Sequence, residues 1–342
     1  MSWIKNVATI VFSTFIAFLI AEILLRMLGI GYGNAPLERS PLYHHVHPSN
    51  YQFLMHDPRA EYGGYNVYYD DLGFRVRDKS SQTLQLTNEE NAIIFLGDSF
   101  TEGNQVTYDE TFVALVGEDL RMPSLNFGVT SYSPLIYELQ IENILSSFDA
   151  NTVVLQVFSN DFASDEGYLE NALVEEGKIT GIDGGKNNYI ISLARNSYLL
   201  RFLQKSQLLL RAILSNTNTN ANASGPISAF DVEQTVTEGQ LQNTVQIIQR
   251  INISLIEQGK KLYVFLIPSK SLSSNNDCCD ADVLFIRFYA ELEEINVNTI
   301  DVRSSFENND NQHKLFFEED IHLTTLGHRE IATSIVSHFK NE

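Results

Sequence analysis

Residues 92–99 read AIIFLGDS, an apolar run followed by Gly97, Asp98 and Ser99. A short continuous apolar run that ends in turn-forming residues is typical of a strand buried on both faces, as in a parallel sheet. In an open parallel sheet, ligands bind beyond the carboxyl ends of the strands. Ser99 is therefore predicted to lie at the edge of the sheet where a functional site forms.

Outward from this strand, apolar runs alternate with stretches that have helical spacing. Further strands are expected at 123–127, 152–158, 261–267 and 297–302, and helices at 112–120, 135–148, 233–258, 281–294 and 325–340. Alternating strands and helices require crossover connections and so indicate a parallel sheet with helices on its faces. The predicted fold class is α/β.

Composition excludes several classes of protein. The 342 residues include 23 Lys and Arg against 43 Asp and Glu, a formal net charge of −20. A nucleic-acid binder needs a basic surface to replace phosphate counterions, so we expect no nucleic-acid partner. A hydrophobic content of 44% supports a large core and argues against wholesale disorder. Cys278 and Cys279 are adjacent, so they supply neither a disulfide framework nor a zinc site.

The amino terminus differs from the rest of the chain. Residues 7–21 carry no charge, and the apolar character continues to Leu25. As a helix, this stretch spans about 28 Å, close to the hydrocarbon thickness of a bilayer. Lys5 makes the leading flank positive, which favours a cytoplasmic amino terminus and export of the remainder to the periplasmic or extracellular side. We expect an uncleaved single-pass anchor in the cell membrane, rather than a cleaved signal peptide or a buried core helix.

The predicted organisation has three parts. They are an anchor at 1–30, an extended approach segment at 31–90 and a main domain at 91–342 with an insertion at about 162–260. Within the insertion, 215–226 is polar and predicts a surface loop. The Leu-rich stretch 198–214 has helical spacing, which is typical of a helix packed on the domain, although a membrane-facing or substrate-covering helix fits the same pattern.

Ser99 needs a base, because a serine hydroxyl is a poor nucleophile until a positioned group removes its proton. His322, just ahead of the last predicted helix, is the best placed of the histidines. Glu319 and Asp320 precede it, and either carboxylate can hold one ring nitrogen so that the other faces the serine.

A serine mechanism also needs preorganised donors for the developing oxyanion. Gly128 follows the strand at 123–127 and can present its backbone N–H, and Asn160 ends the strand at 152–158 and can present its amide. Successive strands thus bring Ser99, Gly128 and Asn160 to one edge of the sheet.

Other polar residues receive structural interpretations. Asp98 is expected to order the serine turn rather than act as a base, and His328 to be a helix residue rather than a second base. A metal site made of His44, His45 and His47 is conceivable, but nothing nearby supplies a convincing further set of ligands.

The ordered set of serine, glycine, asparagine and histidine resembles the SGNH/GDSL hydrolase superfamily, whose first motif the Gly-Asp-Ser block resembles. The resemblance covers about residues 65–340. The stretch DDLGFR at 70–75 and the end of the anchor, AEILLR at 21–26, are similar to the membrane-anchored bacterial members.

The resemblance implies a flavodoxin-like three-layer α/β/α sandwich with a five-stranded parallel sheet and a Ser-His-Asp triad. It also implies an oxyanion hole formed by the Ser99 N–H, the Gly128 N–H and the Asn160 amide. The commonest last motif places Asp three residues before His, where this chain has Glu319. Asp320 lies two before, as in the Asp-x-His variant of some exported polysaccharide-modifying relatives, so Asp320 is the favoured triad acid and Glu319 the alternative.

By this resemblance we expect a membrane-anchored serine esterase that forms an acyl-Ser99 intermediate. Its expected substrate is an acylated carbohydrate or lipid, with a short acyl group on a carbohydrate or cell-envelope molecule favoured. The mechanism requires no cofactor. Two alternatives stay open: an O-acyltransferase that passes the acyl group to a glycan hydroxyl, and an inactive anchored glycan-binding protein.

Overall fold

The computed structural model describes residues 2–28, 36–57, 61–185, 197–203, 206, 236–270 and 280–342. At its centre is a five-stranded parallel sheet in the order β12-β11-β8-β6-β7. The strands are β6 (Ile93–Leu96), β7 (Ser124–Asn126), β8 (Thr152–Val157), β11 (Lys261–Leu266) and β12 (Asn298–Thr299). The predicted α/β fold with a five-stranded parallel sheet is confirmed.

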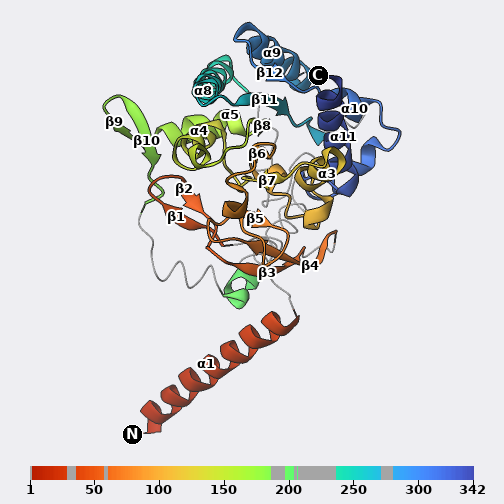
Figure 1. Cartoon of the computed structure of the whole chain (residues 1–342). Coiled ribbons are helices and arrows are strands. Elements are labelled where there is room, and N and C mark those ends of the chain that lie inside the picture. The colour runs from red at the N-terminus through yellow and green to blue at the C-terminus, as the bar shows by residue number, and fades with distance from the viewer. Residues whose placement is uncertain are drawn as a thin grey trace.

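Helices cover both faces of the sheet and complete a three-layer sandwich (Figure 1). One face carries α4 (Pro134–Asn143), α5 (Asp161–Leu169), α8 (Glu238–Glu257) and α9 (Asp280–Glu294), and the other α3 (Phe112–Leu120), α10 (Arg303–Glu307) and α11 (Thr325–Asn341). Ile94 and Leu96 of β6 enter the first core, and Ile93 and Phe95 enter the second. Successive strand residues point to opposite faces, so a strand between two helical layers is apolar on both faces, as β6 is.

The order of the strands decides where the site residues lie. β6, which precedes Ser99, pairs with β7 on one side and β8 on the other. Because all three strands are parallel, their carboxyl ends meet at the same edge of the sheet. The segments that begin with Ser99, Gly128 and Asn160 therefore leave the sheet next to one another, as the sequence predicts.

The approach segment differs from the extended connection expected for 31–90. It forms β1 (Glu38–Ser40), β2 (His44–Val46), β3 (Gln52–His56), β4 (Gly63–Tyr69) and β5 (Arg75–Val76). β3, β4 and β5 make an antiparallel sheet with a small core of its own, which consists of Phe53, Met55, Val67 and Tyr69. These strands have only two to seven residues, so the alternation of apolar and polar side chains that marks a strand cannot be recognised in the sequence.

The region expected to be an insertion contains part of the main fold. After α5 comes the hairpin β9 (Ala172–Glu175) and β10 (Lys178–Ile182), and α8 then packs against β11. The inserted segment is therefore shorter than the predicted range of residues 162–260. The predicted loop at 215–226, most of the Leu-rich stretch at 198–214, and both cysteines lie outside the described residues.

The amino-terminal helix α1 (Ser2–Leu28) projects away from the body of the molecule (Figure 1). Its span Trp3–Leu28 has a mean hydropathy of 2.3 in its apolar window, none of which is buried. It is long and apolar enough to cross a membrane, and a signal sequence meets the same criteria. Near its end, Glu22 accepts hydrogen bonds from the backbone N–H groups of Tyr198 and Leu199.

Candidate active site

Ser99 is the first residue of α2 (Ser99–Glu102), a single helical turn that follows β6. Asp98 caps this turn by accepting the Phe100 N–H at 2.9 Å. Gln156 of β8 accepts hydrogen bonds from the Asp98 N–H and the Thr101 hydroxyl, at 3.1 and 3.0 Å. Burial raises the pKa of Asp98 to about 6. Asp98 thus orders the serine turn, as the sequence predicts.

Gly97 is required by the close packing of this turn. A Cβ at that position would lie 1.9 Å from the Thr101 hydroxyl oxygen and 2.5 Å from Gln156 Oε1. Both atoms take part in the hydrogen bonds that hold α2 against β8, so neither can move without cost. Any larger residue at position 97 would therefore have to displace Thr101 or Gln156.

The structure brings Ser99, His322 and Asp320 into one chain of contacts. The His322 Nε2 atom lies 2.7 Å from Ser99 Oγ, and the His322 Nδ1 atom lies 2.5 Å from Asp320 Oδ1. Asp320 Oδ1 also accepts the His322 backbone N–H at 2.9 Å. With Nδ1–H donated to Asp320, the lone pair of Nε2 faces the serine hydroxyl and can accept its proton.

The environment of Asp320 favours its ionised form. Burial by itself raises the pKa of this carboxyl group, but the charge of His322 and the hydrogen bonds from His322 and Tyr62 outweigh burial and hold the pKa well below its usual range. The Tyr62 hydroxyl donates to Asp320 Oδ2 at 2.7 Å. Glu319 is exposed, and its backbone N–H donates to Glu61. Among the contacts of the described residues, Asp320 is the candidate acid that touches His322.

The three candidate oxyanion donors differ in their availability. Among the described residues, no hydrogen bond uses the Ser99 N–H or the side-chain N–H groups of Asn160, and Asn160 Oδ1 is buried without a partner. The Gly128 N–H donates to Asn126 Oδ1 at 2.9 Å. A substrate oxyanion would therefore have to replace the Asn126 oxygen at Gly128. The stronger hydrogen bond to a charged acceptor favours this exchange, and the loss of a donor by the buried Asn126 oxygen opposes it.

Gly128 also approaches the serine turn closely. A Cβ at Gly128 would lie 2.4 Å from the backbone nitrogen of Glu102 and 2.8 Å from the carbonyl carbon of Thr101. The absence of a side chain allows the loop after β7 to lie directly against α2. No hydrogen bond in the described part of the chain joins Asn160 to either Ser99 or Gly128.

Residues 228–342 match the family model described as SGNH hydrolase-like domain, acetyltransferase AlgX. The matched range contains Asp320 and His322, and Ser99 lies before it. This part of the chain is thus similar to an SGNH hydrolase-like family.

Solved structures of a lipase/acylhydrolase and of an acetylxylan esterase align with most of the chain at low identity. A lipase/acylhydrolase from Enterococcus faecalis is 11% identical, with 73% of this chain and 96% of that chain covered and a TM-score of 0.43. The acetylxylan esterase Axe2 from Geobacillus stearothermophilus is 12% identical, with 74% and 95% covered and a TM-score of 0.43. No curated protein matches the sequence.

Three other histidines occupy structural positions. His328 is buried, and its Nδ1 atom accepts the Phe112 N–H at 3.2 Å. Burial, together with the charge of Arg75, lowers the pKa of His328 to about 3, so the ring is neutral. His45 Nε2 donates to Thr130 O at 2.8 Å, whereas His47 Nε2 lies 2.9 Å from a Glu102 carboxylate oxygen. The conceivable metal site is not formed, and the described ranges contain no cluster of residues able to hold a metal.

Two residues near the site are absent from the sequence-based prediction. Tyr62 contacts the predicted triad acid, and Glu102 lies in the same helical turn as the predicted nucleophile, with no exposed surface. The partners of Tyr62 and Glu102 are distant in sequence, so spacing gives no signal for them. An acidic residue three positions after the predicted nucleophile is the one local feature that could have indicated Glu102.

Proposed function

We propose that this chain is a serine esterase that removes a short acyl group from a carbohydrate or cell-envelope molecule through an acyl-Ser99 intermediate. The observation that carries the proposal is the continuous contact from Ser99 Oγ through His322 to Asp320, at 2.7 and 2.5 Å. Ser99 is partly exposed, whereas the residues that orient it are buried. The nucleophile is therefore accessible and its base is already in place.

The reaction has two balanced halves. His322 Nε2 takes the proton of Ser99 as Oγ attacks the ester carbonyl carbon, and the carbonyl oxygen becomes an oxyanion facing the Ser99 N–H, the Gly128 N–H and the Asn160 amide. His322 then gives the proton to the departing alkoxide, which leaves as an alcohol. In the second half, His322 deprotonates a water that attacks the acyl carbon, and the proton returns to Ser99 as the carboxylic acid departs.

A second candidate is an O-acyltransferase, which the acetyltransferase description of the matched family favours. A sugar hydroxyl would then take the place of water in the second half of the reaction, with the same acyl-enzyme and the same base. Hydrolysis and transfer are separated by following a labelled acetyl group into free acetate or into acetylated glycan. Predominant transfer would establish the second candidate.

We also propose that α1 anchors the enzyme in the cell membrane, with its amino terminus in the cytoplasm and the catalytic domain outside. The proposal is supported by the apolar span Trp3–Leu28 and by Lys5 in the leading flank. A reporter fused after Glu342 should be active only outside the cytoplasm. Activity in the cytoplasm would contradict this orientation.

The catalytic assignment is tested with Ser99→Ala. The variant should lose hydrolysis of p-nitrophenyl acetate and labelling by a fluorophosphonate, because both require the serine oxygen. Ser146→Ala, an exposed serine in the segment between α4 and β8, is the matched control and should behave as wild type. Undiminished turnover in Ser99→Ala would remove the assignment, and an unreactive wild-type protein would favour the binding-protein alternative.

A further inference from the structure

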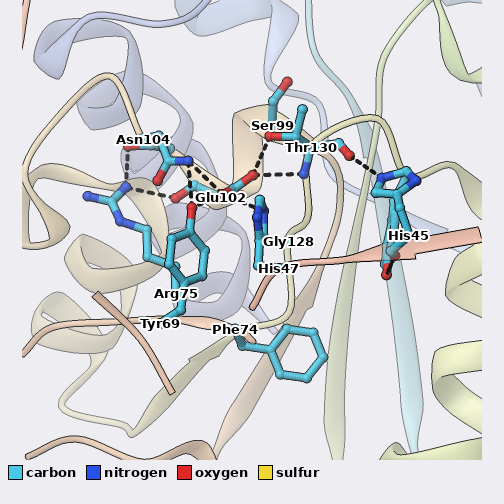
Figure 2. A network of polar contacts seen from close by, with 12 residues as sticks. His45, His47, Tyr69, Phe74, Arg75, Ser99, Glu102, Asn104, Gly128 and Thr130 are labelled. Atoms are coloured by element: carbon cyan, nitrogen blue, oxygen red, sulfur yellow. Dashed lines mark hydrogen bonds and ion pairs between the residues drawn. The ribbon is translucent and has the colours of Figure 1, made fainter. Parts of the chain in front are cut away.

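The carboxylate of Glu102 is the centre of a buried polar network beneath the predicted catalytic serine (Figure 2). Its Oε1 atom accepts hydrogen bonds from the Tyr69 hydroxyl and, at 2.6 Å, from the Asn104 amide, and lies 2.9 Å from His47 Nε2. Its Oε2 atom accepts the Thr130 N–H at 2.7 Å and the Thr130 hydroxyl. Both oxygens are therefore saturated with donors that come from separate parts of the chain.

This network stabilises the negative charge of the Glu102 carboxylate, which has no exposed surface. Burial by itself raises the pKa of Glu102, but the charge of His47 and the hydrogen bonds from Thr130 and Tyr69 outweigh burial and lower the pKa to about 2. A buried carboxylate persists only when it is paired and fully hydrogen-bonded. The donors around Glu102 are thus matched to a charged acceptor with two oxygens.

The partners of Glu102 belong to the elements that border the predicted site. His47 and Tyr69 come from the approach segment, and Thr130 lies two residues after Gly128 in the loop that follows β7. Ser99 is the first residue of α2 and Glu102 the last. One side chain therefore connects the nucleophile turn to the loop of the candidate oxyanion donor.

The backbone around Glu102 is held by hydrogen bonds from a second buried residue, Arg75. Arg75 of β5 is 2% exposed, and it donates to the carbonyl oxygens of Glu102 and Val106, each at 2.7 Å. A third hydrogen bond runs from Arg75 to the Gly103 carbonyl oxygen. α2 is too short to hold its own position, so these external contacts determine where Ser99 stands.

We propose that Glu102 is a positioning residue for acyl transfer: its carboxylate holds the 128–130 loop against α2 and so fixes the Gly128 N–H relative to Ser99. The proposal rests on the proposed function at Ser99. It goes beyond that function by assigning a catalytic consequence to the approach segment, which supplies His47 and Tyr69. Removing the carboxylate should impair the chemical step rather than substrate binding.

The test compares Glu102→Gln with wild type in the full chain. The substitution preserves size, but the carboxamide has one acceptor oxygen and turns an N–H group toward the other donors. We expect kcat for p-nitrophenyl acetate and the rate of fluorophosphonate labelling at Ser99 to fall at least about tenfold per folded molecule, as for the loss of a preorganised oxyanion contact. KM should stay within about threefold, because Glu102 does not touch the substrate.

A matched pair at Thr130 covers the case in which Glu102→Gln fails to fold. Thr130→Val removes the hydroxyl donor and should lower both rates, whereas Thr130→Ser keeps the donor and should restore them. Asp165→Asn, at a buried carboxylate that contacts Ser133 and Thr244 instead, is the structural control and should leave both rates unchanged.

Two results would overturn the proposal. One is a folded Glu102→Gln variant whose labelling rate is within about twofold of wild type, a change too small for a preorganised contact. The other is a pair of Thr130 variants with equal rates. Absence of labelling in wild type would be a different result, because it removes the proposed function at Ser99 and this role of Glu102 with it.

Discussion

The hydroxyl group of Tyr62 donates a 2.7 Å hydrogen bond to Asp320 Oδ2, although the two residues lie 258 positions apart. The other oxygen of Asp320 faces His322, so both carboxylate oxygens have partners. The Tyr62 ring also packs on Phe317, with ring centroids 4.8 Å apart. The approach segment thus orients the candidate triad acid, just as its other residues surround Glu102.

Tyr62→Phe should lower kcat with little change in KM. The substitution keeps the ring on Phe317 and removes only the donor to Asp320. A hydrogen bond to a charged group contributes about 1.5–3 kcal/mol, and we expect part of that, a decrease of about five- to thirtyfold, to appear in kcat. Steady-state hydrolysis of p-nitrophenyl acetate measures it. Tyr263→Phe, whose hydroxyl donates to Glu342 far from the site, is the control. Equal kcat values in the two variants would contradict the role of Tyr62.

Asp320→Asn and Glu319→Gln should separate the two candidate acids. Asparagine at 320 cannot accept the Nδ1 proton in the same way and favours the wrong tautomer of His322, so kcat should fall about 10²–10⁴-fold. Glu319 is exposed and should tolerate the amide with less than about a twofold effect. The measurement is kcat for the acetyl ester at neutral pH. A larger loss in Glu319→Gln would reverse the assignment.

The central sheet can be predicted from the sequence because its strands are buried on both faces. β6 is a continuous apolar run and β8 and β11 are mainly apolar, and their parallel pairing follows from the helices between them. The strands of the approach segment cannot be predicted in this way. β5 has only two residues, and its place in the antiparallel sheet is set by pairing with β4.

The residues of the candidate site are likewise predictable from the sequence only in part. Ser99, Gly128 and Asn160 each follow a recognisable strand, and His322 stands in a recognisable block ahead of the last helix. Tyr62 and Glu102 depend on contacts between distant segments, which a single sequence does not record. The hydrogen bond from the Gly128 N–H to Asn126 depends on the position of the Asn126 side chain, which strand prediction does not provide.

Gly128→Ala should impair catalysis more than it impairs folding. The added methyl group would meet the backbone of Thr101 and Glu102 at 2.4 to 2.8 Å, so the loop after β7 must move away from Ser99. We expect kcat to fall about tenfold or more. Gly167→Ala in α5 is the control, because nothing lies within 4 Å of its added Cβ and alanine favours a helix by about 1 kcal/mol. Wild-type kcat in Gly128→Ala would show that the close approach of this loop is not needed.

Asp165 gives the fold a measurable pH dependence. Its carboxyl group accepts hydrogen bonds from the Ser133 hydroxyl, the Leu135 N–H and the Thr244 hydroxyl, at 2.6, 2.9 and 2.7 Å. Burial is the larger influence and raises the pKa of Asp165 from 3.8 to about 6. Because the folded state binds this proton more tightly than the unfolded state, the stabilisation is complete below about pH 4 and is lost as the pH rises to about 6.

Asp165→Asn should therefore gain stability relative to wild type as the pH rises. Asparagine keeps an acceptor for the Ser133 and Leu135 donors and never ionises, so it avoids a buried charge at neutral pH. A difference of about two pKa units corresponds to about 3 kcal/mol. We therefore expect the stability advantage of the variant over wild type, measured as the free energy of unfolding, to grow by about 3 kcal/mol between pH 4 and pH 7. Urea unfolding across this pH range measures the change, with the exposed Asp310→Asn as the control. If the difference between Asp165→Asn and wild type stayed constant with pH, the buried carboxyl group would not titrate in this range.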